Sequence, residues 1–310
     1  MKPWFPASTP RIPSFRADLK AHGALLTVAL LYGGNYFVAK GVFDFLSPAG
    51  AVAIRTGGSA LLLILLGTGM GRLVKVPPRK DIYRLILCAF FGAILNQNLF
   101  FAGLARTTEV NASVIMTTSP IFVFLVAYLA RAEVLNLPKI IGLIVSFSGA
   151  LLLSVAGRTI DLEADTLVGD LLVVSNACSY AIYLVLVQPL MKRYDVITIM
   201  AWIFGLAALI NVPFGVPAIM AADWAAMDWT VYGRLAYLVL GVTVLAYSLN
   251  AYALKRVPSS QVGVYIYLQP VIVSVLAAFL PNKHIGWMQM LCMMLVFVGV
   301  ALVTYGKKTK

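Results

Sequence analysis

The sequence predicts an all-α protein that crosses a lipid bilayer many times. Hydrophobic residues make up 61% of the 310 residues and charged residues only 12%, whereas soluble domains carry about 25% charged residues. The apolar runs recur at about the 20-residue length that a helix needs to span a bilayer. We therefore expect a polytopic membrane protein of ten transmembrane helices.

Ten apolar runs account for nearly all of the chain, with short connections between them. They lie near 22–42, 49–69, 83–105, 110–130, 139–156, 169–190, 197–216, 232–254, 259–280 and 286–305. Residues 1–20 are basic and proline-rich and predict a short disordered tail, and 307–310 form a basic tail. The first run continues through a full span without a clean small-x-small cleavage site, so we expect it to be an uncleaved helix.

The distribution of basic residues predicts that both termini are cytoplasmic. With the N-terminus inside, the outer connections hold only Arg106, Arg158, Arg234 and Lys283, and most of the other lysines and arginines fall in inner ones. Cytoplasmic loops carry such an excess of lysine and arginine. The net charge of +12 therefore serves orientation in a cell (inner) membrane rather than binding to nucleic acid.

Two proline-bearing stretches relate the halves of the chain. Thr118-Ser119-Pro120 and Leu268-Gln269-Pro270 lie 150 positions apart in otherwise apolar runs. The same offset pairs Arg106 with Arg256 and Gly149 with Gly299. Proline removes a backbone donor and clashes with the preceding turn, so Pro120 and Pro270 should kink or break their helices.

The internal repeat divides the chain into residues 21–157 and 168–306. Each copy holds five spans, and an odd number inverts the second copy relative to the first. Inverted repeats place a substrate site near the bilayer midplane, between the halves and beside interrupted helices. We therefore expect a central polar cavity between two inverted five-helix repeats.

Polar residues near mid-span are the candidates for the wall of this cavity. Intramembrane polar groups are costly and mark substrate pathways, and tyrosine offers an aromatic or amphipathic ligand a flat apolar face with one hydrogen-bonding tip. The candidates are Asn35, Asn96, Asn98, Thr118, Ser119, Tyr180, Tyr183, Tyr247, Asn250, Tyr265 and Gln269. Packing is the alternative for each, because amides join neighbouring helices and hydroxyls bond to the preceding turn.

Two basic residues are candidate charge anchors. Arg55 is the only arginine well inside a span, and Lys40 lies at the outer end of the first helix. Each either binds the anionic group of a carboxylate-bearing substrate or extends its charge toward the membrane surface. No aspartate or glutamate lies at mid-span, so the buried carboxylate relay of many proton-driven pumps has no equivalent, and facilitated diffusion or exchange stays open.

Motifs for catalysis or cofactor binding are missing from the sequence. It holds no H-E-x-x-H, phosphate loop or serine elbow, and its three cysteines are isolated in hydrophobic spans, without metal or disulfide spacing. An intramembrane enzyme would need a cluster of histidine, acidic or cysteine residues that the spans lack. We expect no enzyme and no cofactor, with a small-molecule substrate and the lipid bilayer as the partners.

Several ordered motifs resemble those of one transporter family. Tyr32-Gly33-x-Asn35 is followed by Lys40 and Arg55, Ala112-Ser113 leads to Pro120 and Glu133, and Ser259-Ser260 leads to Pro270 and Gly299. The chain in this respect resembles the EamA-type carriers of the drug/metabolite transporter superfamily, which have ten helices in two five-helix repeats. It departs from them in Lys283, where a glutamate is usual, and in Tyr32, where tryptophan is frequent.

The resemblance implies transport of small molecules, because members export amino acids, nucleotide-like metabolites or drugs. We expect a secondary transporter that exports a small amphipathic metabolite, with an amino acid as the leading candidate, by alternating access. A carrier of drugs or nucleotide-type metabolites is the alternative within this fold. A structural or regulatory membrane protein without transport is the alternative from another class.

Overall fold

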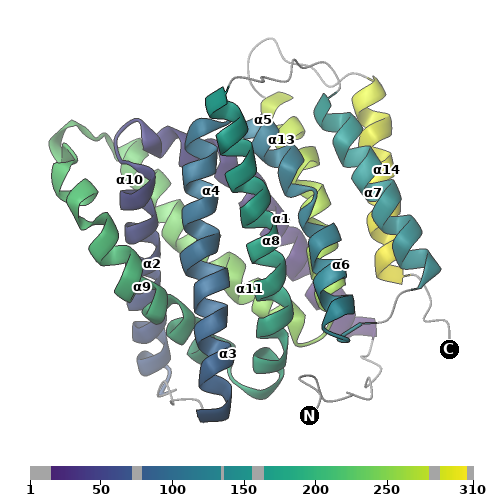
Figure 1. The fold of residues 1–310 in the computed structure, drawn as a ribbon, viewed down its shortest axis with the longest axis horizontal. Coiled ribbons are helices and arrows are strands. Elements are labelled where there is room, and N and C mark those ends of the chain that lie inside the picture. The colour runs from purple at the N-terminus through teal and green to yellow at the C-terminus, as the bar shows by residue number, and fades with distance from the viewer. Residues whose placement is uncertain (1–14, 72–78, 134–135, 156–163, 279–286, 306–310) are drawn as a thin grey trace.

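Helices make up nearly all of the described chain. The computed structural model describes residues 15–71, 79–133, 136–155, 164–278 and 287–305 (Figure 1). The first repeat contains α1 (Phe15–Phe43), α2 (Pro48–Gly69), α3 (Arg79–Ala89), η1 (Phe90–Ile94), α4 (Leu95–Arg106), α5 (Glu109–Met116), α6 (Ser119–Leu129) and α7 (Leu137–Val155). The second contains α8 (Ala164–Arg193), α9 (Val196–Ala221), η2 (Trp224–Ala226), α10 (Trp229–Ala236), η3 (Tyr237–Leu245), α11 (Ala246–Leu254), α12 (Ser259–Val264), η4 (Tyr265–Tyr267), α13 (Leu268–Ala278) and α14 (Trp287–Tyr305).

The helices have the length and surface of membrane spans. Eight helical segments of the described chain are long and apolar enough to cross a bilayer, and Leu137–Leu152 and Met290–Thr304 are shorter apolar helices. Each of the ten predicted spans falls on one of these segments. Large apolar side chains such as Leu209 and Phe214 point outward with more than two thirds of their surface exposed, which a bilayer accommodates and water does not. The prediction of an all-α membrane protein is confirmed.

Several helix starts follow from local sequence. Asp195 caps α9 by accepting hydrogen bonds from the backbone of Ile197 and Thr198, and Ser47 caps α2 directly before a proline in its first turn. Such side chains satisfy backbone donors that have no partner within the helix. One expectation is wrong: α1 begins at Phe15, so the end of the predicted disordered tail 1–20 is helical. Residues 1–14 and the basic tail 307–310 lie outside the described residues.

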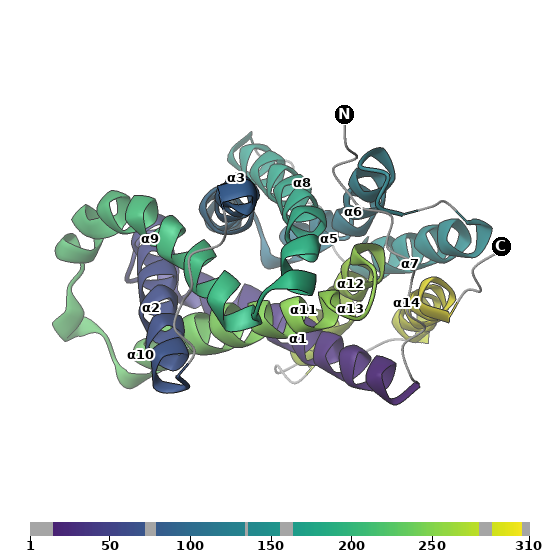
Figure 2. The same ribbon diagram turned by 90° about the horizontal axis from the view of Figure 1, so that it is seen from below.

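Packing between the halves has two-fold symmetry. α2 packs along α9, α7 along α14, and α6 against α12, which pairs the second, fifth and fourth spans with their counterparts. α1 packs on α11, and α4 packs on α8. The contact between the first and eighth spans therefore mirrors the contact between the third and sixth spans. The α2–α9 and α7–α14 pairs lie at opposite sides of the bundle (Figure 2). The start of α1 and the end of α14 lie at one end of it (Figure 1).

Helix interruptions occur at corresponding places in the two repeats. The π-helical segments η1 and η3 lie within the third and eighth spans. The fourth span breaks at Thr117–Thr118, between α5 and α6, and the ninth narrows to the 3₁₀ turn η4. Pro120 and Pro270 each stand in the first turn of the helix that restarts after the break, where proline lacks only a donor that would have no partner.

Candidate functional site

A cavity lies between the two repeats, near the middle of the spans. Residues from both halves line it: Tyr32, Asn35, Tyr36, Arg55, Asn96, Gln97, Phe100, Met116, Asn176, Tyr180, Val242, Tyr247, Ile266 and Gln269. Its volume is about 60 Å³, which is room for a few water molecules. The place of this cavity is the one that inverted repeats give to a substrate site.

The π-helical segment η1 brings the third span to the cavity wall. A π turn leaves backbone carbonyls out of the usual α-helical pattern, and such turns are frequent at functional sites. Side chains of the second repeat bond to three of these carbonyls: Ser179 Oγ to Phe91 O at 2.7 Å, Tyr247 Oη to Gly92 O at 2.9 Å, and Asn211 Nδ2 to Ala93 O at 3.2 Å. Buried backbone in a membrane needs such partners, so the second repeat holds η1 in place.

Asn96 and Asn176 form an amide wall between the third and sixth spans. Asn176 Nδ2 donates to the backbone carbonyl of Asn96 at 2.7 Å, and Asn96 Nδ2 lies 3.5 Å from the backbone carbonyl oxygen of Asn176. Because a carbonyl only accepts, the first bond fixes the orientation of the Asn176 amide. Its Oδ1 is buried and has no hydrogen-bond partner among the described residues. The wall therefore contains one buried acceptor that the described residues leave unsatisfied.

Hydroxyl and amide pairs connect the first, sixth, eighth and ninth spans beside the cavity. Tyr36 Oη donates to Gln269 Oε1 at 2.8 Å, and both side chains are buried. Asn250 Nδ2 donates to Tyr180 Oη at 3.0 Å and lies 3.3 Å from Tyr32 Oη. The Tyr36–Gln269 and Asn250–Tyr32 contacts join the two repeats beside the cavity, so a movement of one half against the other would change the shape of the wall.

Arg55 brings a positive charge to the cavity, and the residue is only 4% exposed. Its Nε donates to Thr243 Oγ1 at 3.0 Å, and its guanidinium carbon lies 4.8 Å from the centre of the Phe101 ring. Among the described residues that line the cavity, none is an aspartate or glutamate. A buried charge without a counter-charge is costly, so this cavity is suited to an anionic group.

The predicted site residues divide into three groups. Asn35, Asn96, Tyr180, Tyr247 and Gln269 line the cavity, as does Arg55. Asn250 and Tyr265 line a smaller adjoining recess of about 10 Å³, which Tyr180 and Gln269 share. The remaining candidates, Asn98, Thr118, Ser119, Tyr183 and Lys40, are not among the lining residues.

Local bonds and packing explain why these other candidates lie off the cavity wall. Asn98 donates to Asn211 Oδ1 at 2.9 Å, and the Thr118 hydroxyl donates to the Ile115 carbonyl at 2.7 Å. Ser119 Oγ lies 3.9 Å from Met116 Sδ, and the Tyr183 hydroxyl lies 4.0 Å from Met200 Sδ. Lys40 Nζ donates to the backbone carbonyls of Leu104 and Thr107 at the end of α4. The helix dipole stabilises a cation at this end.

Some lining residues did not stand among the predicted ones. Tyr32, Tyr36, Gln97, Phe100, Met116, Asn176, Val242 and Ile266 belong to this group. Helical spacing holds the signal for two of them, because Tyr36 follows Tyr32 by four positions and Asn176 precedes Tyr180 by four. Residues four apart share a helix face.

Comparison with known proteins decides the family. A model of the EamA-like transporter family matches residues 19–155 and again residues 167–305. The chain belongs to the EamA-like transporter family. The resemblance seen in the sequence motifs is thereby confirmed, and the two matches correspond to the two five-helix repeats of the fold.

Relatives of this EamA family protein are themselves named transporters. An uncharacterized transporter of Archaeoglobus fulgidus is 28% identical over 92% of this chain and 97% of its own length. The uncharacterized transporter YyaM of Bacillus subtilis is 22% identical over 89% of this chain and 90% of its own. A solved crystal structure superposes with a TM-score of 0.72 over 95% of this chain and 99% of its own, at 17% identity. At that identity the likeness shows the fold alone.

Proposed function

We propose that this EamA family transporter exports a small amphipathic metabolite that carries a carboxylate, with an amino acid as the leading candidate. The observation that carries the proposal is Arg55, a buried cation on the wall of the cavity between the repeats. Arginine binds carboxylates through two parallel hydrogen bonds. Its Nε is already bound to Thr243, so the far side of the guanidinium is the part that would receive the substrate.

The other lining residues suit the remainder of an amino acid. Within the described part of the chain, Asn176 Oδ1 and Asn35 Oδ1 are buried acceptors without a partner, and an ammonium group supplies three donors. Tyr180 and Tyr247 bring aromatic faces to the same cavity, which suit an apolar or aromatic side chain. This division into a cationic, an acceptor and an aromatic part supports a substrate with two polar groups and an apolar body.

The size of the cavity supports alternating access as the mechanism. A cavity of about 60 Å³ has room for only a few water molecules, and an amino acid with an aromatic side chain needs more space than these waters occupy. The repeats must therefore move apart before the substrate enters, as rocking of inverted repeats about a midplane site allows. Outward direction is proposed on the resemblance to exporters, together with the predicted orientation in the cell (inner) membrane with both termini cytoplasmic.

Uptake into liposomes that hold the purified protein tests this proposal. A panel of labelled amino acids, monocarboxylates, nucleotides and cationic drugs, with and without a pH gradient, should give saturable uptake for a carboxylate-bearing solute. Arg55→Gln should abolish that uptake, and Arg106→Gln, which changes an exposed arginine at a helix end, should leave it intact. Equal uptake by Arg55→Gln and the wild type would contradict the role of Arg55. Silence across the whole panel would favour the structural or regulatory class.

A further inference from the structure

The end of α6 has an unusual backbone conformation. Arg131 has a φ of 54°, a left-handed conformation that glycine adopts without steric cost and arginine does not. Its N–H bonds to the Tyr128 carbonyl and the N–H of Ala132 to the Ala127 carbonyl, both at 2.9 Å. This pair of bonds is the Schellman ending of a helix. Strain of this kind persists only where the surroundings hold it, so contacts just after Arg131 should be strong.

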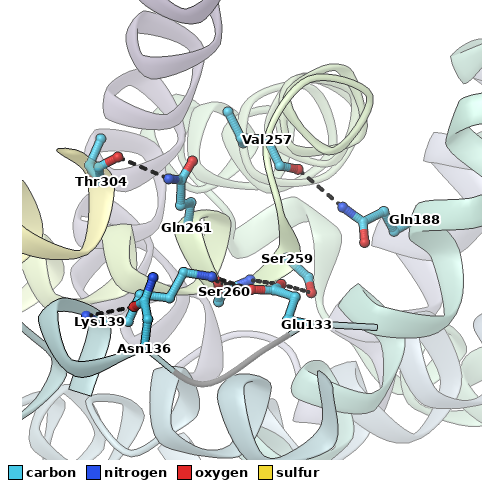
Figure 3. Close-up of polar contacts among 9 residues, drawn as sticks. All are labelled: Glu133, Asn136, Lys139, Gln188, Val257, Ser259, Ser260, Gln261 and Thr304. Atoms are coloured by element: carbon cyan, nitrogen blue, oxygen red, sulfur yellow. Dashed lines mark hydrogen bonds and ion pairs between the residues drawn. The ribbon is translucent and has the colours of Figure 1, made fainter. Parts of the chain in front are cut away.

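Glu133 makes those contacts, and they cross from one repeat to the other (Figure 3). Its Oε1 accepts hydrogen bonds from Ser259 Oγ and from the backbone N–H of Ser260, each at 3.0 Å. Its Oε2 accepts from Ser260 Oγ and from Lys139 Nζ, the latter at 2.8 Å. Only 8% of the Glu133 side chain is exposed. A carboxylate of the first repeat is thus buried against the start of α12 in the second.

The two serine partners of Glu133 are held firmly on the second repeat. Gln188 Nε2 donates to the Val257 carbonyl at 3.1 Å, and Gln261 Nε2 donates to the Thr304 carbonyl at 3.0 Å (Figure 3). These bonds tie the connection before α12, and α12 itself, to α8 and α14. The serines therefore move with the second repeat, and Glu133 moves with the first.

The helices that Glu133 joins are also closely packed. α6 lies against α12, and a Cβ added to Gly263 would lie 3.1 Å from a methyl carbon of Val123. This contact lies at the end of the bundle where the basic residues Lys139, Lys255 and Arg256 predict the cytoplasm. Movement of one repeat away from the other at this end would therefore separate α6 from α12.

We propose that Glu133 is the lock of the predicted cytoplasmic gate, which holds α6 against α12 while that side is closed and releases Ser259 and Ser260 when it opens. This inference rests on the alternating access of the proposed function. Hydrogen bonds to an ionised group are about twice as strong as neutral ones. A buried carboxylate that loses them is costly until water replaces them, so partial opening is unfavourable. The contact therefore has two states, closed and dry or open and hydrated.

Hydrogen–deuterium exchange of the full-length protein in lipid nanodiscs tests the lock without a substrate. Glu133→Gln removes the charge that Lys139 and the serines bind, and should speed amide exchange in peptides 125–133 and 257–264 by about tenfold, an effect of about 1.4 kcal/mol. Peptides at the other end, 221–232, should be unchanged. Glu109→Gln is the matched control, because Glu109 begins α5 at that opposite end. Unchanged exchange in folded Glu133→Gln would overturn the proposal.

A second variant keeps the test decisive if Glu133→Gln does not fold. Ser260→Ala removes one hydroxyl donor from the other repeat and keeps the carboxylate, so it should speed exchange of the same peptides by a few fold. Where both single variants fold, their effects should not add in the double variant, because both act on one contact. Additive effects, or no effect of Ser260→Ala, would overturn the lock. Absence of transport by the wild type with exchange as expected would refute the proposed function and leave the lock intact.

Discussion

The hydroxyl of Tyr247 lies 2.9 Å from the carbonyl oxygen of Gly92 and thereby joins the eighth span to the π-helical segment of the third. Gly92 also leaves room for the ring of Tyr183, because an added Cβ would lie 2.3 Å from that ring. The Tyr247 ring packs edge-on against Phe204, with ring centres 5.0 Å apart. One tyrosine thus supports the backbone of the opposite repeat and lines the cavity.

Loss of this hydroxyl should destabilise the protein. Tyr247→Phe keeps the ring packing and leaves the Gly92 carbonyl without its donor, which costs about 1 kcal/mol in helical membrane proteins. Thermal unfolding in detergent measures the loss. Tyr252→Phe is the control, because the contact of the Tyr252 ring with Arg256 does not depend on the hydroxyl that this change removes. An equal loss in both variants would show that the Gly92 contact contributes nothing.

Gln269→Ala should lower transport more than stability. The change leaves the Tyr36 hydroxyl without the Gln269 oxygen that accepts its hydrogen bond at 2.8 Å. It also enlarges the cavity. We expect at least a tenfold loss of uptake, which is about 1.4 kcal/mol in substrate interaction, with expression maintained. Ser175→Ala, an exposed hydroxyl that bonds within its own helix, should retain full uptake. If Gln269→Ala instead loses uptake only in proportion to folded protein, Gln269 is a packing residue.

Gly299→Ala should separate α7 from α14. An added Cβ would lie 2.5 Å from the Ser146 backbone nitrogen and 2.7 Å from the Gly142 carbonyl oxygen, so the helices must shift. Overpacking of this kind costs about 1–3 kcal/mol. Gly205→Ala meets nothing within 4 Å and should be neutral or stabilising by up to about 1 kcal/mol. In detergent, the unfolding midpoint of Gly299→Ala should therefore fall, and that of Gly205→Ala should stay unchanged or rise.

The contribution of Glu133 to stability should disappear in acid. Burial raises the pKa of Glu133, but Lys139 and the hydrogen bonds from Ser260 outweigh it, and the net result is a lowered pKa. Lys139 on α7 is the charged group that faces it, with the hydroxyls of Ser259 and Ser260 on α12. A depressed folded pKa means that the contribution is complete above the unfolded pKa of about 4.3 and lost as pH falls through the folded pKa.

Comparison of the wild type with Glu133→Gln across pH measures this contribution. The difference in unfolding free energy should be constant between about pH 7 and pH 5 and shrink below about pH 4. The wild type alone gives an ambiguous result, because other carboxylates titrate in the same range. A difference that grows on acidification would show that the carboxylate is bound in its protonated form.

Sequence predicted the depth of residues in the membrane better than the direction in which they point. Span position alone placed Asn96, Tyr180 and Gln269 at the level of the cavity. The face of a helix depends on its rotation, and η1 alters the turn just before Asn96 and Asn98. Asn98 consequently bonds to Asn211 instead of lining the cavity. No residue in Phe90–Ile94 gives a sequence signal for the π turn.

Hydroxyls and long-range contacts account for the other differences. Thr118 bonds to its own helix, an alternative that a sequence leaves open for every serine and threonine. Glu133 and Ser259 are 126 positions apart, and their contact depends on the packing of α6 on α12 and on the left-handed turn at Arg131. Neither the packing nor the turn has a local sequence signal, since glycine is the residue expected at such a turn.

The two π-helical segments give each half of the protein a surplus residue within a transmembrane helix. A π turn holds more residues than an α turn, and that excess can sit at one turn or the next without a change in the ends of the span. Its passage along the helix would rotate Asn96 in one half, or Tyr247 in the other, about the helix axis. Such a shift would rotate side chains of the third and eighth spans independently of the proposed rocking of whole repeats.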